Sequence, residues 1–219
     1  QLAKGRQMIG GNFNYNYNSR SNRDTSGNRP QQNSKNTYFT GTLRYGYFIT
    51  DQIVVGITGF YSQGAGNGQS YFLDQGQSYQ STFSQSSNAY SAGVFSRYYK
   101  MLCKSRFAVF GNLTATYGMG DTKYKNTYSQ SGGSGSDESI QSTSTYSLGF
   151  SPGITYFVNN RIGLETYFGN LGFSAQKYEN SRNGKKMQEG TNSNINSNLN
   201  FSFSSLFIGL NFYFGGNTR

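Results

Sequence analysis

The feature that most constrains this chain is a period-two alternation of apolar and polar residues. In residues 8–18, aromatic and aliphatic side chains occupy one parity, and asparagines occupy most of the other. Because successive side chains of a β-strand point to opposite faces, this segment predicts a strand with one apolar and one polar face. The same alternation recurs in residues 37–48, 53–62, 88–100, 106–118, 143–157, 161–173 and 198–214. The sequence therefore predicts an all-β fold of eight strands.

The two faces of these strands are arranged opposite to those of a water-soluble protein. No Lys, Arg, Asp or Glu falls on the apolar face of any of the eight segments, and the other face is rich in Asn, Thr, Ser and Gly. A lipid-facing Arg or Lys at mid-membrane costs about 2–4 kcal/mol, whereas the outer face of a soluble strand normally carries charges. We therefore expect the apolar faces to meet hydrocarbon and the polar faces to be enclosed. A soluble β-sandwich is the alternative.

The connections between the segments alternate in length. Short turns are expected around residues 50–51, 102–104 and 159–160, and long polar connections over 19–36, 63–87, 119–142 and 174–197. Bacterial outer-membrane barrels have short turns on the periplasmic side and longer loops outside the cell. We predict an eight-stranded antiparallel up-and-down transmembrane β-barrel with short periplasmic turns and long extracellular loops, formed by residues 1–219 as a single domain.

Composition excludes several kinds of chemistry. The 219-residue chain contains no histidine and one cysteine, Cys103. Without histidine it cannot build a Ser-His-Asp or Cys-His catalytic site, and most zinc sites are excluded as well. A single cysteine cannot form an intramolecular disulfide. We expect no enzymatic activity, no cofactor and no metal site.

The net charge of +10 comes from scattered basic residues, and Lys185-Lys186 is the only adjacent pair. No element carries the basic stripe that nucleic-acid binding needs, so nucleic acid is not an expected partner. A lipid bilayer whose outer leaflet carries lipopolysaccharide is the anionic partner that we expect instead. The sequence begins at Gln1 rather than Met, so we expect a mature product of signal-peptide cleavage or a trimmed chain.

Three stretches resemble the small outer-membrane β-barrel proteins of the porin-like superfamily. They are Lys4-Gly5 with Met8-Ile9-Gly10-Gly11, residues 151–157 leading into 161–165, and residues 206–214. The resemblance covers all the expected strands. It implies the outer membrane of a Gram-negative bacterium, reached through the inner membrane with a cleaved signal peptide. It also implies that the closing strand is the signal read by the barrel assembly machinery, through Leu206, Ile208, Leu210, Phe212 and Phe214.

Three charged residues lie on the polar faces of the expected strands. Arg44, Arg97 and Glu165 each lie about five residues from a short turn, so they should share a similar height in the barrel. The lumen of an eight-stranded barrel is filled by its own side chains, and buried charges there must be paired. We predict an Arg-Glu-Arg network that packs and plugs the lumen. An ion path past these residues is the alternative.

Three functions remain open. In the first, the barrel is a structural or accessory component that binds another outer-membrane protein, or a larger complex, through its wall or loops. Small residues on the apolar face would allow close packing there: Gly41, Gly59, Ala92, Gly111 and Ala115. In the second, loop aromatics bind an extracellular ligand, as in adhesion. The candidates are Tyr71, Phe72, Tyr79, Phe83, Tyr124 and Tyr128. In the third, which the narrow lumen makes the weakest, the barrel conducts small solutes.

Overall fold

The computed structural model describes residues 2–22, 31–74, 77–102, 106–130, 133–199 and 209–215. These residues form antiparallel strands, in chain order β1 (Gln7–Asn22), β2 (Gln31–Phe48), β3 (Ile53–Asp74), β4 (Gln77–Met101), β5 (Phe107–Gln130), β6 (Gly133–Phe157), β7 (Ile162–Tyr167), β8 (Gly169–Arg182), β9 (Lys185–Leu199) and β10 (Gly209–Phe214). Within the described residues we find no helix with the length and apolar character needed to cross a membrane.

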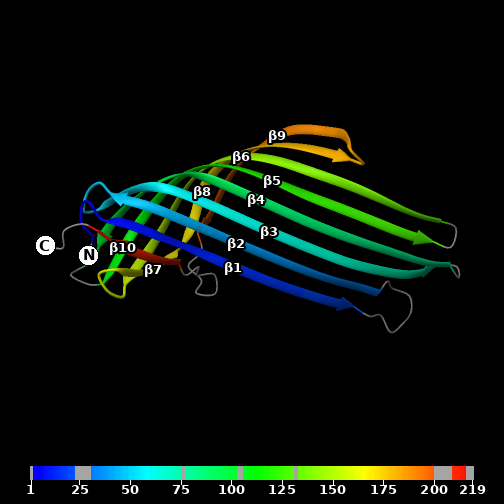
Figure 1. The fold of residues 1–219 in the computed structure, drawn as a ribbon, viewed down its shortest axis with the longest axis horizontal. Coiled ribbons are helices and arrows are strands. Elements are labelled where there is room, and N and C mark those ends of the chain that lie inside the picture. The colour runs from blue at the N-terminus through cyan, green and yellow to red at the C-terminus, as the bar shows by residue number, and fades with distance from the viewer. Residues whose placement is uncertain are drawn as a thin grey trace.

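The strands close into a ring at the end that carries the short turns. β1 to β6 follow one another as an up-and-down meander (Figure 1). β10 pairs with both β1 and β7, and β7 pairs with β6. β8 continues β7, while β9 pairs back on β8. The predicted eight-stranded antiparallel barrel is confirmed, with its last two strands each present as two segments, β7 with β8 and β9 with β10.

The interruption between β7 and β8 is a β-bulge. Tyr167 pairs with Gly153 but Leu171 pairs with Phe150, so three residues of this strand lie opposite two of β6. Pro152 lies at this point of β6, and its carbonyl accepts a 3.0 Å hydrogen bond from the backbone nitrogen of the residue between β7 and β8. In a strand the nitrogen and carbonyl of one residue point the same way. The missing N–H of Pro152 therefore faces the bulge, where the loss of a ladder bond is tolerated.

The bulge changes which face each side chain occupies. Glu165 on β7 is buried in the lumen, whereas Leu171, which has the same parity, is 54% exposed on the outer side of β8. Phe168 lies between the two segments and is one of the residues that line a cavity of the lumen. Gly169 adopts φ 154°, a conformation that favours glycine at this irregular point.

The expectation of long loops is wrong for most of the residues concerned. The connections expected over 63–87, 119–142 and 174–197 consist largely of strand. β4 and β6 contain 25 residues each, which corresponds to about 80 Å at 3.3 Å per residue. A tilted strand needs only about 9–11 residues to cross a membrane. Polar Ser, Gln and Asn residues therefore extend the sheet beyond the bilayer. Of the expected connection 19–36, residues 23–30 lie outside the described residues.

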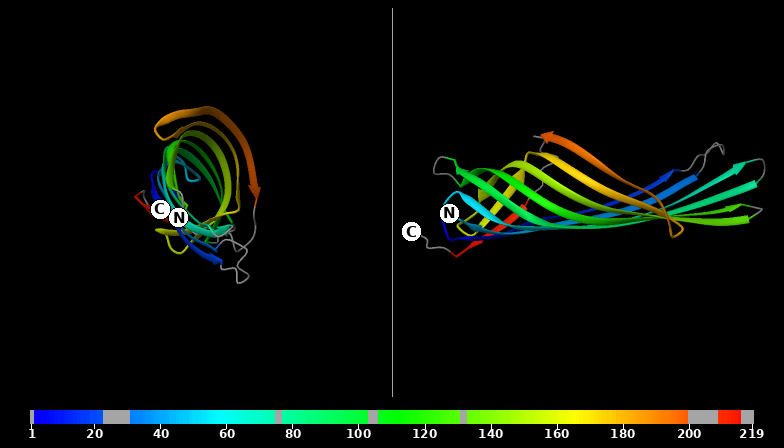
Figure 2. Two further views of the ribbon diagram at one scale, coloured as in Figure 1. Left: turned by 90° about the vertical axis from the view of Figure 1, so that its right-hand side faces the viewer. Right: turned by 90° about the horizontal axis from the view of Figure 1, so that it is seen from above.

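The wall differs between the two ends of the barrel. β1 pairs with β10 only through Gly11, although its other edge pairs with β2 as far as Asn22. In the described part of the chain, no strand pairs with the outer edge of β9, and none covers the same edge of β1 beyond Gly11. Figure 2 shows β9 standing apart from β1. The described strands therefore close the ring only near the short turns.

Apolar side chains cover the outside of the barrel. Phe13 is 82% exposed and Leu43 is 62% exposed, whereas Arg97 is fully buried. The same outward exposure holds for Ile57, Val94, Leu113, Leu148 and Leu210. This confirms the predicted arrangement, in which the apolar face of each strand lies on the outside of the barrel and Arg97 is enclosed.

Two aromatic pairs mark the height of the apolar band. The rings of Phe107 and Tyr156 lie 4.9 Å apart, and those of Tyr117 and Tyr146 lie 4.7 Å apart. The pairs are ten residues apart on both β5 and β6. Ten residues at 3.3 Å, tilted by about 40°, span about 25 Å, the height of the apolar band of an outer-membrane barrel. On these strands the two pairs therefore lie where the aromatic girdles of an outer-membrane barrel meet the two membrane interfaces.

Candidate functional site

Three charged side chains meet inside the lower part of the barrel. The carboxylate of Glu165 on β7 pairs with Nη1 of Arg44 on β2 at 3.3 Å and with Nη1 of Arg97 on β4 at 2.5 Å. The side chains of Arg97 and Glu165 are completely buried, and that of Arg44 keeps 14% exposure. The structure brings together the three residues named from the sequence, with Glu165 between the arginines. We call them the lumen cluster; two guanidinium groups and one carboxylate give it an excess of one positive charge.

The carboxylate of Glu165 has further hydrogen-bond donors. Nδ2 of Asn211 on β10 donates to it at 2.7 Å, and the hydroxyl of Tyr167 donates at 3.1 Å. Gly209 pairs with Glu165 across the β10–β7 register, and a Cβ at Gly209 would lie 2.9 Å from the Cγ of Glu165. Glycine at this position gives the side chain its space. β10 therefore closes the ring and also completes the cluster.

Each nitrogen of the Arg97 guanidinium has a hydrogen-bond partner. Nε donates to Oδ1 of Asn112 at 3.1 Å, Nη1 donates to the hydroxyl of Tyr99 at 2.9 Å, and Nη2 donates to the hydroxyl of Tyr167 at 2.7 Å. Its central carbon lies 4.3 Å from the centre of the Phe110 ring, a cation–π contact. These partners compensate the buried positive charge of Arg97. Removing one of them would leave part of that charge without compensation in a medium of low dielectric constant.

Aromatic side chains fill the lumen between the cluster and the short turns. The rings of Phe48 and Tyr99 lie 5.9 Å apart, and Tyr213 lies 6.2 Å from Phe48 and 5.4 Å from Phe157. These four residues, which we call the aromatic plug, are at most 1% exposed. At the same end Arg6, 4% exposed, donates from Nη2 to the carbonyl of Tyr213 at 3.1 Å. The expectation of a polar inner face is therefore wrong at this end, where side chains meet closely enough to exclude water.

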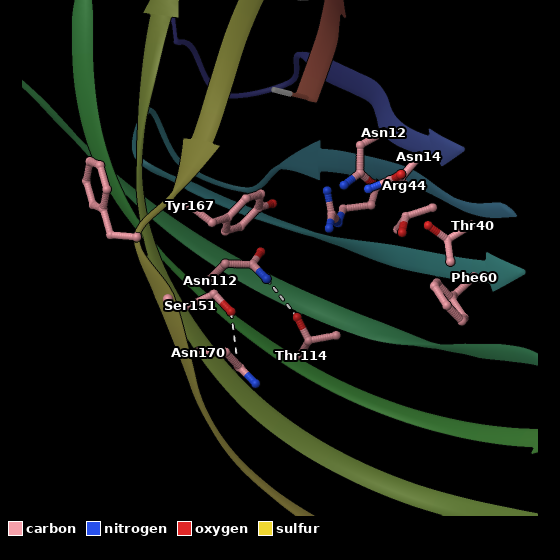
Figure 3. Close-up of a pocket in the computed structure, with 13 residues that line it drawn as sticks. Asn12, Asn14, Thr40, Arg44, Phe60, Asn112, Thr114, Ser151, Tyr167 and Asn170 are labelled. Carbon is pink, nitrogen blue, oxygen red and sulfur yellow. Dashed lines mark hydrogen bonds between the residues drawn. The ribbon is translucent and has the colours of Figure 1, made fainter. Parts of the chain in front are cut away.

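A cavity of about 490 Å³ lies on the side of the lumen cluster that is opposite to the aromatic plug (Figure 3). Asn12 and Asn14 of β1 flank Arg44 on one side of it, and Asn112 and Asn170 lie across the lumen. Arg44 is the only charged residue among the described residues that line the cavity. The lumen is thus filled at the short-turn end and hollow, polar and basic above the cluster.

The arrangement suits ion pairing better than catalysis. The carboxylate of Glu165 is occupied by donors from Arg44, Arg97, Tyr167 and Asn211, so it is not available as a general base. Over the described residues, no three His, Cys, Asp or Glu side chains gather to hold a metal ion, and Cys103 lies outside them. The cluster can tie three strands together, β2, β4 and β7, and it presents one guanidinium to the cavity.

Sequence patterns did not single out Tyr167 and Asn211, which donate hydrogen bonds to the lumen cluster. They also did not single out Tyr99 and Tyr213 of the aromatic plug. A usable signal existed for the tyrosines of the plug. Neighbouring residues of a strand point to opposite faces, so the outward Tyr98 places the ring of Tyr99 inside the barrel. Tyr213 follows the same rule within the closing strand. No comparable signal marks Asn211, because many inward positions of this chain carry asparagine.

The six aromatic residues assigned to loops lie on strands. Tyr71 and Phe72 are on β3, Tyr79 and Phe83 are on β4, and Tyr124 and Tyr128 are on β5. By strand alternation Tyr71 belongs to the outer face, whereas Phe83, Tyr124 and Tyr128 belong to the inner face. The ring of Phe83 covers Gly68 of β3, and Tyr128 covers Gly135 of β6. We find no ring contact between Tyr71, Phe83, Tyr124 and Tyr128 in the described structure, so these four do not form one platform for a ligand.

The closing strand holds part of the expected assembly signal. Leu210, Phe212 and Phe214 point outward from β10, with exposed fractions of 39%, 45% and 43%. Leu206 and Ile208 lie outside the described residues. β10 thus presents an apolar outer row while it pairs with both β1 and β7.

Comparisons of the sequence with known protein families and with characterised proteins find no match. The structure is similar to several solved structures. The outer membrane protein OprG from Pseudomonas aeruginosa matches with a TM-score of 0.46 and 14% identity over 98% of both chains. The attachment invasion locus protein Ail of Yersinia pestis gives 0.35 and 14% over 96% of this chain and 99% of its own. Neisserial surface protein A gives 0.32 and 14% over 97% and 99%. The likeness is one of fold.

Proposed function

We propose that this protein is a non-enzymatic structural or accessory component of a bacterial outer membrane, which spans the bilayer without conducting solutes and binds another outer-membrane protein through its wall. The filled lower lumen is the observation that supports this most strongly. Arg97 and Glu165 are at most 2% exposed, and the aromatic plug, which includes Tyr99, lies beneath them. A solute path would have to displace these side chains and break buried ion pairs, which is costly.

The outer surface supports a location in the outer membrane. The two aromatic pairs on β5 and β6 bracket a band of about 25 Å. Between them β5 presents Val109, Gly111, Leu113 and Ala115 outward, without a charge. The partners of this surface would be the bilayer and its lipopolysaccharide, with the barrel assembly machinery acting during insertion.

The wall around β2 and β3 is the part we propose for contact with another membrane protein. A Cβ at Gly59 would meet no atom closer than 4.0 Å, and one at Gly41 would meet only the ring of Phe39, at 3.7 Å. The packing of the barrel itself therefore does not require glycine at these two positions. Gly111 differs, because the ring of Phe150 already covers it. Small residues on a lipid-facing wall allow a second membrane protein to approach closely.

Conductance in planar lipid bilayers tests the filled lumen. The purified protein should insert without giving single-channel steps. The double variant Tyr99→Ala with Tyr213→Ala removes two rings of the aromatic plug and should give small steps, which shows that insertion and current are measurable. Steady conductance from the unchanged protein would contradict the proposal.

Site-specific photocrosslinking in native outer membranes tests the wall. A photoreactive residue at Leu43, beside Gly41 and Gly59, should give a defined adduct with a second outer-membrane protein. The matched control is Phe150 on β6, four strands away in a ring of eight and also exposed. Equal adducts at both positions, or none at Leu43, would reject this part of the wall as the contact.

A further inference from the structure

The cavity above the lumen cluster has the properties of a small-molecule site. Its volume of about 490 Å³ lies within the range of known ligand pockets, about 300–1,000 Å³. It is blind, because the lumen cluster and the aromatic plug fill the barrel below it. We infer that this cavity binds a small sugar acid, a free solute that carries one carboxylate and several hydroxyl groups. This goes beyond the proposed function and does not depend on it.

The excess positive charge of the lumen cluster favours the binding of an anion. Glu165 is held closely by Arg97, at 2.5 Å, and more loosely by Arg44, at 3.3 Å. Among the described residues Arg44 makes one ion pair, through Nη1, and its guanidinium lies 5.4 Å from the centre of the Tyr167 ring. Because two guanidinium groups face one carboxylate, one positive charge is left at the floor of the cavity. A ligand carboxylate that receives N–H donors from Arg44 would compensate it.

Exposure shows that a ligand can reach Arg44. Its side chain keeps 14% exposure while its partner Glu165 keeps none. Figure 3 shows Arg44 beside Asn12 and Asn14 on the wall of the cavity. The exposed surface of Arg44 is therefore surface of the cavity, so a ligand carboxylate could bind it without disturbing the pair between Arg97 and Glu165.

The walls of the cavity favour a ligand with hydroxyl groups over a simple anion. Asn14, Thr40 and Thr42 line one side, and Ser151 and Asn170 line the other. Such amides and hydroxyls can both donate and accept hydrogen bonds, as sugar hydroxyls do.

One side-chain oxygen in the wall of the cavity has no hydrogen-bond donor among the described residues. Oδ1 of Asn12 is buried and has no hydrogen-bond partner among the described residues, so it can accept a ligand hydroxyl. The rings of Phe60 and Tyr167 also line the cavity and offer apolar faces for the C–H surface of a sugar. Acid, hydroxyl and ring contacts together describe a sugar acid.

Binding can be measured by calorimetry on the folded protein in a zwitterionic detergent at low ionic strength. D-Glucuronate should bind saturably, and D-glucose and acetate should each bind at least about tenfold more weakly, because each lacks one half of the recognised chemistry. Arg44→Gln should weaken glucuronate binding at least about tenfold. Arg20→Gln removes an exposed charge of β1 far from the cavity and should leave the affinity unchanged.

A second variant keeps the test decisive if Arg44→Gln fails to fold, which a gel shift on unheated samples would reveal. Asn14→Asp leaves the lumen cluster intact and places a carboxylate beside Arg44, where it competes with the ligand, so glucuronate binding should be lost. The inference is overturned if glucuronate does not saturate, if acetate binds equally well, or if both variants bind like the unchanged protein.

Discussion

The two ends of this barrel are held together by different interactions. Near the short turns, β10 closes the ring and the side chains of Arg97, Tyr99 and Glu165 are buried completely. Beyond the apolar band, the strands are joined mainly by their backbone ladders, and their side chains are largely exposed on both faces. The lower end thus resembles a small protein core, whereas the upper end is an extended sheet. Side-chain substitutions should therefore act very differently at the two ends.

The substitution that should destabilise the lower end of the barrel most is Glu165→Gln. It removes the only carboxylate of the lumen cluster and leaves Arg97 buried without a counter-ion. Breaking a buried pair from one side costs about 3–5 kcal/mol, and we expect a loss of that size in the free energy of unfolding, measured with urea in detergent micelles.

A matched substitution at the upper end serves as control. Glu189 pairs with Lys186 on β9, with a side chain that is 55% exposed. Glu189→Gln should leave the unfolding free energy unchanged within error, because exposed pairs contribute little. A loss of similar size in both variants would contradict the contrast between the two ends.

The next largest effect concerns the apolar band. Leu113 lies on β5 midway between Phe107 and Tyr117 and is 49% exposed towards the lipid. Leu113→Arg should cost about 2–4 kcal/mol in a bilayer, because it places a charge near the middle of the hydrocarbon. Met187→Arg on β9, 65% exposed, should cost almost nothing, since it lies above the band. Folding into vesicles at increasing urea measures both, and equal costs would show that the band is misplaced.

The lower end could be predicted from the sequence because its signals are local. The short turns carry side chains that cap them: Oγ1 of Thr50 accepts from the nitrogen of Ile53 at 2.9 Å, and Oδ1 of Asn159 accepts from that of Ile162 at 2.9 Å. A charge such as Arg44, on the face opposite the apolar residues, must be enclosed, and enclosed charges need partners. Alternation and the scarcity of charge were therefore enough to name the three residues of the lumen cluster.

The upper end could not be predicted in the same way. Residues 63–74 contain three glycines, and residues 119–130 are mostly polar or charged; both compositions are typical of loops. These residues form strands nevertheless, because neighbouring backbones satisfy their hydrogen bonds. The bulge at Phe168 was missed because it depends on the register between β7, β8 and β6, which no single segment encodes. At the lower end, strand alternation could have placed the inner rings of the aromatic plug inside the barrel. The contacts between those rings could not be predicted, because they depend on the closure of the ring of strands.

The smallest expected effect is a pH response confined to the upper end. Asp137 on β6 pairs with Arg182 on β8 at 2.7 Å, far above the apolar band. The hydrogen bond from Arg182 lowers the pKa of the Asp137 carboxyl below its ordinary value. A carboxyl whose folded-state pKa is depressed stabilises the folded state at pH above its ordinary pKa. That contribution is lost as the pH falls through the lowered pKa, so the upper β6–β8 sheet should open locally in acid while the lower end stays closed.

Hydrogen exchange and carboxyl NMR titration can detect this local response. On acidification, amide protection near residues 137–139 and 180–182 should fall, while protection near residues 153–157 should not change. Arg182→Gln should raise the pKa of Asp137 towards its ordinary value and abolish the pH dependence of amide protection, without altering the overall unfolding midpoint. Because the pair is exposed, added salt should have the same effect in a milder form. If Asp137 titrates identically with and without Arg182, the ion pair does not hold these strands, and their pairing depends on the backbone ladder alone.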